Sequence, residues 1–245
     1  PDNATLVVVG DVDPEEVYRQ AQKYFGPLQA SKVVAPKPRL ETAQRGMKRI
    51  EVKAPAKLPY LLMGYKVPVV RTAELPWEPY ALAVLAGVLD GGMAARLESQ
   101  LVHGGEVAAS AGASYDEYDR LDSLFLLSGT PATGYNMEDL ERAFVDQIRK
   151  LQDEPVTSAE MDRVVAQISA EKVYEQDSIF YQAMQIGILE TVGLSWKDAD
   201  RYLERIKAVT PEQVQAVARK YLRSDHLTVA ELVPQPIDSR QPPRS

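Results

Sequence analysis

The segment LPYLLMGYKVP, residues 58–68, constrains the fold more than any other part of the sequence. In an extended conformation, Leu61, Met63 and Tyr65 point to one side of the chain, and the residues between them point to the other side. Both sides are apolar. A strand that is apolar on both sides is typical of the middle of a sheet, so we predict that this segment is a central strand.

Neighbouring segments supply the rest of this sheet. Residues 47–53 are predicted to form a strand, and residues 107–113 and 121–127 form two further strands that can pair with each other. The segment HLTVAELV, residues 226–233, is predicted to be the last strand of the chain. The sheet is therefore expected to come mainly from residues 47–130.

The C-terminal half is predicted to be mostly helical. Apolar residues recur every three or four positions from Met137 to Leu151, which is the period of one helix face. Thr157 and Thr210 each precede a Glu or Gln by three residues, as in a capping box at a helix start. A shorter helix is predicted at residues 93–102, with three apolar residues on one face: Met93, Leu97 and Leu101. Grouped strands and helices without regular alternation predict an α+β fold.

The composition excludes several classes of function. The net charge is −7 and the isoelectric point is about 5.1, whereas nucleic-acid binding requires a clustered basic surface. There is no cysteine, which excludes disulfides, thiolate metal sites and cysteine nucleophiles. No apolar run approaches the ~20 residues that a membrane-spanning helix needs. Phosphate-binding loops and serine-hydrolase motifs are also absent from the sequence.

One motif looks like part of a metal site. His103 and Glu106 have the spacing found in zinc-binding motifs, but the second histidine is missing and two glycines lie between them. Glycine disfavours the helix on which such ligands are usually placed. The other histidine, His226, lies 123 positions further along the chain. We therefore predict no metal site in this sequence, with His103 in an exposed turn.

The N-terminal segment is predicted to be the end of a domain. Residues 6–9 are expected to form a buried strand, and Asp13 followed by Pro14 begins a helix that ends near Gly26. The segments NATLVVVGDV and DHLTVAELVP share a pattern, which two related domains would explain and which chance explains as well. Because the sequence begins at Pro1, we interpret it as an excised or processed piece of a longer chain.

Three segments occur in a familiar order and spacing: NATLVVVGDVDPEEV, YALAVLAGVLDGGMAARLESQL and VTPEQVQAVARKYLRSDHLTVAELVP. Together they resemble the pitrilysin/insulinase family of zinc peptidases (inverzincins), over residues 1–233. Members of this family have two similar α+β domains that close like a clamshell around a peptide. In each domain, helices pack on one face of a mixed or antiparallel sheet. The resemblance implies that this chain is the second, inactive domain.

The resemblance also divides the chain into four parts. These are residues 1–26 as the final strand and helix of the preceding family domain, 27–46 as a linker, 47–233 as the inactive C-terminal domain and 234–245 as a disordered tail. The prolines and scattered charges of residues 27–46 are typical of a linker.

The resemblance indicates where catalytic groups would lie. The family binds zinc through an H-x-x-E-H motif on a helix, which this sequence lacks. The second domain often supplies an Arg and, seven positions later, a Tyr, which stabilise the oxyanion at the zinc. The corresponding positions here are Val102 and Ala109, whose side chains cannot donate a hydrogen bond. We therefore predict no catalytic residue and no cofactor in this chain, and we expect zinc in an upstream domain.

Two residues are candidates for peptide binding. Arg96 could reach a peptide carboxylate, and Tyr115 could contact a peptide from a strand turn. Each has an alternative role that the sequence leaves open. Arg96 could instead pair with a neighbouring acidic residue, and Tyr115 could lie at a solvated hairpin tip.

The combined prediction is a non-catalytic C-terminal domain that forms one wall of a peptide-binding chamber. The parent protein is expected to be a zinc metalloendopeptidase. Two alternatives stay open. The parent could be a scaffold or assembly subunit without peptidase activity, like the respiratory-complex core proteins of this family. Alternatively, the chain could be a free-standing peptide-binding module.

The expected partners follow from this prediction. They are the upstream catalytic domain or a partner subunit of the family, together with peptide substrates, and neither nucleic acid nor a membrane segment is expected. The unpaired edge of the strand at residues 6–9 would also allow a homodimer. Because bacterial relatives are often exported, we predict a periplasmic location, with the cytoplasm as the alternative.

Overall fold

A computed structural model of the chain describes residues 3–29, 34, 37 and 42–236. The chain divides into two compact units. The sheet unit comprises Ala43–Gln167 and Glu204–Ser245, and the helical unit comprises Pro1–Thr42 and Ile168–Leu203. Each unit has its own architecture.

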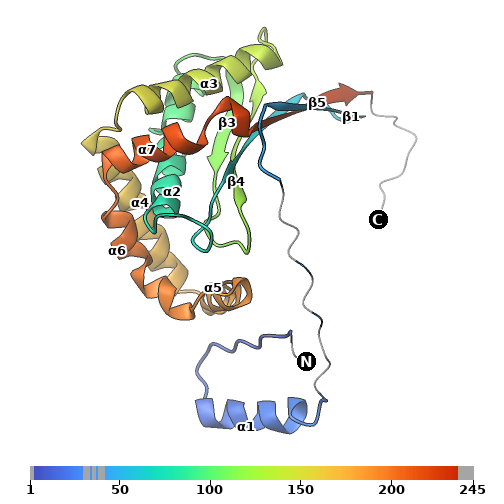
Figure 1. Ribbon diagram of the computed structural model, residues 1–245, viewed down its shortest axis with the longest axis vertical. Helices are drawn as coiled ribbons and strands as arrows, with labels where there is room; N and C mark the ends of the chain where they lie inside the picture. The colour runs from blue at the N-terminus through green and yellow to red at the C-terminus, as the bar shows by residue number, and fades with distance from the viewer. Residues whose placement is uncertain (1–2, 30–33, 35–36, 38–41, 237–245) are drawn as a thin grey trace. The chain divides into compact units, whose positions relative to one another are not determined.

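The sheet unit is built on five strands in the order β1-β5-β2-β4-β3 (Figure 1). Their bounds are Lys48–Pro55 (β1), Tyr60–Val67 (β2), Ala108–Ser114 (β3), Ser123–Pro131 (β4) and Leu227–Gln235 (β5). β1 is parallel to β5 and the other pairs are antiparallel, so the sheet is mixed. β2 is the third strand of the five, which confirms its predicted central position.

The two faces of this sheet have different surroundings. The strand register places Leu61, Met63 and Tyr65 of β2 on the same face as Phe125 of β4 and Val229 of β5. All five side chains are at most 2% exposed. Alternate residues of each strand point to the opposite side. The first side is called the covered face below, and the second side is called the open face.

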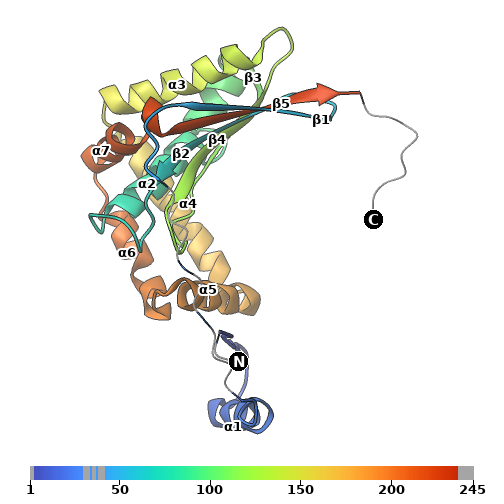
Figure 2. The same cartoon turned by 45° about the vertical axis from the view of Figure 1, so that its right-hand side comes forward.

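Three helices pack on the covered face, and Figure 2 shows them on one side of a sheet that is seen close to edge-on. They are α2 (Glu78–Leu89), α3 (Met137–Asp153) and α7 (Pro211–Tyr221). Leu140 and Phe144 of α3 are fully buried, which confirms the apolar stripe that the sequence predicts. α2 is apolar on every side and almost wholly buried, as expected of a helix within a core. The predicted α+β fold with helices on one face is confirmed.

The helix starts match the predicted capping boxes. Thr210 and Gln213 exchange both hydrogen bonds of the box at the start of α7. Thr157 and Glu160 do the same at the start of α4 (Ser158–Gln176). These bonds satisfy backbone N–H groups that a helix leaves unpaired at its first turn.

The helical unit holds the C-terminal part of α4 and three further elements: α1 (Pro14–Phe25), α5 (Ile179–Val192) and the 3-10 helix η2 (Trp196–Arg201). α1 begins at the predicted Asp13 cap. η2 is followed directly by a short α-helix, α6 (Tyr202–Lys207). Among the described residues, no helix combines the length and the hydropathy that crossing a bilayer requires.

The structure differs from the sequence prediction at residues 6–9, which form no strand. A strand needs a neighbour that satisfies its backbone groups. Leu6 and Val8 are instead exposed, and Val7 lies beside Gly187 of α5. The assignment of residues 1–26 to a preceding domain stays a prediction.

Two predicted boundaries involve residues outside the described part of the chain. β5 continues to Gln235, and the predicted boundary of the domain at residue 233 stays a prediction. Of the predicted tail, residues 237–245 lie outside the described residues. The same holds for much of the predicted linker, namely residues 30–33, 35–36 and 38–41.

Candidate functional site

The segment that contains His103 is a turn that follows a single-turn π-helix, η1 (Glu98–Val102). Leu97 and Leu101 are buried, as the sequence predicts. Met93 is 78% exposed, so its predicted place on the same face was wrong. The physical reason is that the helical residues begin only after it, and Met93 itself lies in a turn.

His103 is an exposed residue of this turn. Its Nε2 lies 3.1 Å from Oε1 of Glu98, and Glu106 has a positive φ of 49° that suits a tight turn. His226 lies in a separate 3-10 turn, η3 (Ser224–His226), directly before β5. Within the described residues, no three His, Asp or Glu side chains gather as a metal site would require.

Arg96 forms a bidentate ion pair with Glu160 of α4. Its Nε donates to Oε1 at 2.6 Å, and its Nη2 donates to Oε2 at 3.0 Å. The Arg96 guanidinium lowers the pKa of Glu160 from 4.5 to about 2. Nε and Nη2 of Arg96 are therefore already engaged by Glu160. The ion pair that the sequence left open as an alternative is therefore present, and a peptide contact stays a prediction.

Tyr115 also has internal partners. Its hydroxyl donates to the carbonyl oxygen of Pro68 at 2.6 Å, and its ring stacks on Phe125 with a centroid distance of 6.4 Å. Burial raises the pKa of this hydroxyl. Tyr115 is therefore not at a solvated hairpin tip, because it fastens the end of β3 to the end of β2. A peptide contact for Tyr115 likewise stays a prediction.

The two positions where the family has an Arg and a Tyr lie at opposite ends of the same turn. Val102 is the last residue of η1 and is partly buried. Ala109 is exposed on β3, where the register shifts between Ala108 and Ser110. Neither side chain has a polar atom. The turn therefore offers no side-chain donor at either position.

The free edge of β3 is partly blocked by Asp90. The backbone N–H of Ala113 donates to Oδ2 of Asp90 at 3.1 Å. Gly112 leaves room for this carboxylate, since a Cβ there would lie 3.1 Å from the same oxygen. An extended peptide could pair with this N–H only by displacing Asp90. Sequence reasoning missed this contact, for which an Asp before a glycine pair was the available signal.

The glycine-rich end of α2 serves close packing. Arg163 of α4 donates to the carbonyl oxygens of Gly87, Val88 and Gly91, which caps the C-terminal end of α2. A Cβ on Gly87 would lie 2.7 Å from Cγ1 of Val164. These glycines therefore let α4 approach α2 within van der Waals distance.

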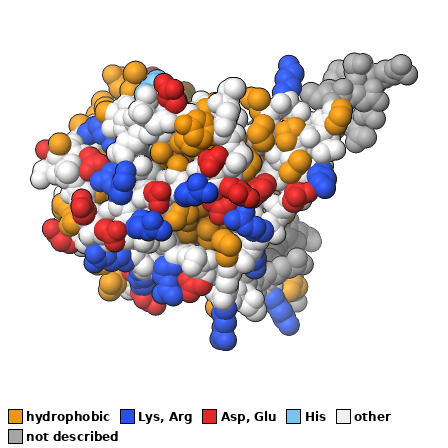
Figure 3. All heavy atoms as spheres, turned by 90° about the horizontal axis from the view of Figure 1, so that it is seen from above, with side chains coloured by type: hydrophobic (Ala, Val, Ile, Leu, Met, Phe, Trp, Pro, Cys, Tyr) orange, Lys and Arg blue, Asp and Glu red, His pale blue; other side chains and the backbone are white. Residues whose placement is uncertain are grey.

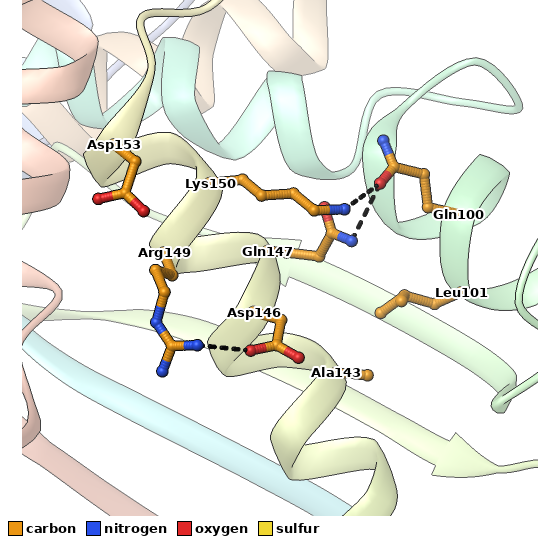
Figure 4. Close-up of a pocket in the computed structure, with 8 residues that line it drawn as sticks. All are labelled: Gln100, Leu101, Ala143, Asp146, Gln147, Arg149, Lys150 and Asp153. Atoms are coloured by element: carbon orange, nitrogen blue, oxygen red, sulfur yellow. Dashed lines mark hydrogen bonds and ion pairs between the residues drawn. The ribbon is translucent and has the colours of Figure 1, made fainter.

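A shallow pocket of about 470 Å³ lies between α3 and η1 (Figure 4). Oε1 of Gln100 accepts from Nε2 of Gln147 at 3.1 Å and from Nζ of Lys150 at 3.0 Å. Arg149 pairs with Asp146 beside them. The buried Oε1 of Gln147 has no hydrogen-bond partner among the described residues, but it is closed off from solvent. The pocket thus offers few free polar groups to a ligand.

The open face of the sheet is a larger candidate surface. Ile50, Val52, Tyr60 and Leu124 lie on it and are each 42–48% exposed. In the view of Figure 3, acidic and basic side chains are interleaved and apolar side chains gather between them. An exposed and contiguous apolar patch marks an interaction surface. The open face is therefore the strongest candidate for binding a partner.

A comparison with protein families decides the identity of this domain. The family model described as "Peptidase M16 inactive domain" matches residues 1–168. The chain belongs to the peptidase M16 inactive-domain family. This confirms the family and the inactive domain that the sequence resemblance predicts.

Curated relatives of this M16 inactive domain are named zinc proteases. Zinc protease PqqE of Helicobacter pylori is 29% identical over 168 residues, which are 67% of this chain and 36% of the relative. An uncharacterized zinc protease of Streptomyces coelicolor is 27% identical over 234 residues, which are 91% of this chain and 48% of the relative. The M16 inactive domain thus spans about half or less of the length of these relatives.

Solved structures share the fold of the M16 inactive domain. A protease from Helicobacter pylori has a TM-score of 0.83 at 23% identity, over 92% of this chain and 54% of that one. Complex III2 from Candida albicans matches with a TM-score of 0.70 at 14% identity, over 91% of this chain and 53% of that one. The periplasmic protease PqqL from Escherichia coli has a TM-score of 0.69 at 13% identity, over 92% of this chain and 26% of that one.

The zinc that the relatives' names imply finds no matching ligands here. His103 faces one carboxylate, Glu98, and a protein zinc site usually has three or four ligands. His226 has a buried Nδ1 without a hydrogen-bond partner among the described residues, but no second ligand gathers around it. The described residues of this M16 inactive domain therefore do not fit a zinc centre.

Proposed function

We propose that this domain is the non-catalytic half of a zinc metallopeptidase, and that the open face of its sheet forms one wall of a chamber that encloses peptides. The open face is the observation that carries this proposal. Three helices bury the covered face, whereas large apolar side chains stay exposed on the open face. Such a surface is stabilised when another molecule covers it.

The chemistry is assigned to an upstream catalytic domain that binds zinc through an H-x-x-E-H motif. Three observations support this assignment. The relatives are named zinc proteases, this chain matches about half or less of their length, and its described residues hold no zinc ligand set. A partner subunit of the family could supply in trans the Arg and Tyr that are missing at Val102 and Ala109.

The N-terminal residues 1–26 are assigned to the end of that upstream domain, with residues 27–46 as the linker. None of the residues of α1 is buried, although Tyr24 and Phe25 belong to it. Leu6 and Val17 line a shallow apolar hollow beside them. A helix with an uncovered apolar stripe is expected to pack against a further surface.

We place the protein in the periplasm. PqqL of Escherichia coli, which has the same fold, is named a periplasmic protease. The absence of cysteine is compatible with that compartment and with the cytoplasm. Cell fractionation distinguishes the two locations.

An assembly role is the second candidate. The match to Complex III2 from Candida albicans supports it, because that structure is a multi-subunit complex that contains this fold. In an assembly role, another subunit would cover the open face. No peptide would then bind there, and the parent protein would not hydrolyse peptides.

The experiment uses the full-length protein that contains this domain. Its zinc content and its hydrolysis of quenched peptides are measured with and without a chelator. We expect bound zinc, chelator-sensitive hydrolysis and no hydrolysis by residues 1–245 alone. Val52→Glu on the open face should raise KM and leave kcat nearly unchanged, since it alters binding and not chemistry. Met93→Glu, at an exposed apolar position in a turn, is the matched control.

The opposite result has a clear form. A full-length protein without zinc and without hydrolysis, isolated in a stable complex with other subunits, would reject the peptidase proposal and favour the assembly role. Unchanged KM in Val52→Glu would reject the chamber wall while leaving the catalytic half in place.

A further inference from the structure

The charged residues of the strands are divided unequally between the two faces. Arg49 of β1 pairs with Glu141 of α3 and with Glu231 of β5, so it lies on the covered face. Strand alternation places Glu51 and Lys53 on that same face. Glu51 and Glu231 are the acidic residues of the five strands. The open face therefore carries no acidic strand residue.

Two basic residues lie on the open face, at the same end of the sheet. Lys48 of β1 is opposite Thr228 of β5, and Thr228 is opposite Gly64 of β2. Lys66 is two residues beyond Gly64 on the same face. Lys48 is exposed, and Thr228 beside it is uncharged. This end of the open face is basic.

Large apolar side chains occupy the open face on β1, β5 and β2. Val52, Leu232 and Tyr60 form one row across β1, β5 and β2, and Ile50 and Leu62 flank β5 in the next row. All five side chains are half-buried or exposed. Covering such side chains is worth about 25 cal/mol for each Å² removed from water. An apolar area with one basic end is therefore available to a ligand.

We infer that the open face selects extended peptides in which large apolar side chains are flanked by an acidic side chain that pairs with Lys48. This inference rests on the proposed function and names the class of peptide that the chamber takes. Apolar burial supplies most of the affinity, because one exposed ion pair contributes at most about 1 kcal/mol. The ion pair sets the orientation and disfavours basic peptides.

A second copy of this chain fits the open face less well. Two copies that pack through the same surface would bring together two faces whose charged strand residues are all basic. Lys48 would then find no acidic strand residue on the partner face. A peptide with an acidic side chain satisfies both the apolar rows and the basic end.

The experiment compares fluorescent peptides of equal length, each unstructured when free. An apolar core carries an acidic, neutral or basic flank, and a polar core with an acidic flank is the fourth peptide. Fluorescence anisotropy with residues 1–245 gives each Kd. We expect the acidic-flank apolar peptide to bind about tenfold more tightly than the polar one and about fivefold more tightly than the basic-flank one.

Matched variants locate the binding. Lys48→Glu should reverse the preference between acidic and basic flanks, whereas Lys57→Glu, the same charge change in the turn between β1 and β2, should not. Val52→Glu should weaken binding of every apolar peptide, and Met93→Glu should not. Circular dichroism spectra that match the wild type show that each variant is folded.

Several results would overturn the inference. They are equal affinity for all flanks, tighter binding of the basic-flank peptide, or no binding of any peptide. Self-association that Val52→Glu abolishes in analytical ultracentrifugation would also overturn it and identify a second copy as the occupant. Zinc-dependent hydrolysis by the full-length protein is a separate measurement, so the proposed function can stand when this inference fails.

Discussion

The hydroxyl of Tyr221 in α7 donates a hydrogen bond to Oε2 of Glu78 at 2.9 Å. Glu78 belongs to α2 and is only 1% exposed. Nζ of Lys220 donates to the other oxygen, Oε1, at 2.6 Å. Removal of a carboxylate from water is costly unless hydrogen bonds satisfy it. The two contacts therefore join α2 to α7 and stabilise the helical layer on the covered face of the sheet.

We first predict that loss of this carboxylate destabilises the domain. Glu78→Ala leaves the Tyr221 hydroxyl without its acceptor, and we expect the free energy of unfolding to fall by about 2–4 kcal/mol. Tyr221→Phe should cost less, about 1–2 kcal/mol, because Lys220 still satisfies Glu78. Urea denaturation measures both variants and the double variant. Additive losses would contradict the contact, since paired residues show a coupling energy.

The second prediction concerns pH and the pair between Arg96 and Glu160. The pKa of Glu160 is lowered from 4.5 to about 2 in the folded state by Arg96. The pair therefore stabilises the fold fully above about pH 4.5, and this contribution is lost as the pH falls toward 2. Partial solvent contact limits the loss to about 1–2 kcal/mol.

Glu160→Gln isolates this effect, because it keeps the shape of the side chain and removes the titrating group. The difference in unfolding free energy between wild type and variant should shrink from pH 7 to pH 3, as measured in urea. Glu212→Gln, an exposed change in α7, is the control. A difference that is independent of pH would refute the pairing.

The third prediction tests how closely α2 packs on α4. A methyl group on Gly87 would lie 2.7 Å from Cγ1 of Val164, and the branched valine side chain has little freedom to move. We expect Gly87→Ala to lower the unfolding free energy by about 1–2 kcal/mol, since overpacking outweighs the gain in helix propensity. Val164→Ala in the same chain should recover part of this loss. Thermal unfolding of Gly87→Ala, Val164→Ala and the double variant measures these losses of stability. A double variant that recovers no stability would contradict the clash.

Local patterns in the sequence predicted the elements well. The alternation of β2, the stripe of α3 and the capping boxes at Thr157 and Thr210 all appear in the structure, because each depends on residues within a few positions of one another. The central place of β2 followed from its apolar sides. That β5 would lie between β1 and β2 had no local signal, since Lys48 and Thr228 are far apart in the sequence.

The candidate site was harder to predict for the same reason. The absence of a zinc ligand set follows from residue types alone, as does the absence of a donor at Val102 and Ala109. The partners of Arg96 and Tyr115 lie 64 and 47 positions away, so only the folded chain reveals that both side chains already have partners. The open face likewise emerges only when four strands align their apolar residues on one side.

The last prediction concerns the carboxylate at the free edge of the sheet. Asp90 accepts a hydrogen bond from the N–H of Ala113 at 3.1 Å, which is a backbone group that points away from β4. In Asp90→Ala this N–H faces solvent, and we expect its hydrogen exchange to accelerate by about tenfold, the factor that corresponds to a lost hydrogen bond of about 1.4 kcal/mol.

Amide exchange measured by NMR provides the readout, with residues of β4 as internal references. Asp116→Ala, which removes a local bond to the N–H of Tyr118, is the matched control. Because an unprotected edge is a template for strand pairing, Asp90→Ala should also aggregate faster at high protein concentration. Two results would show that Asp90 does not protect the edge: unchanged hydrogen exchange of the Ala113 N–H in Asp90→Ala, or an equal acceleration of that exchange in Asp116→Ala. A peptide could then pair with β3 as well as lie on the open face.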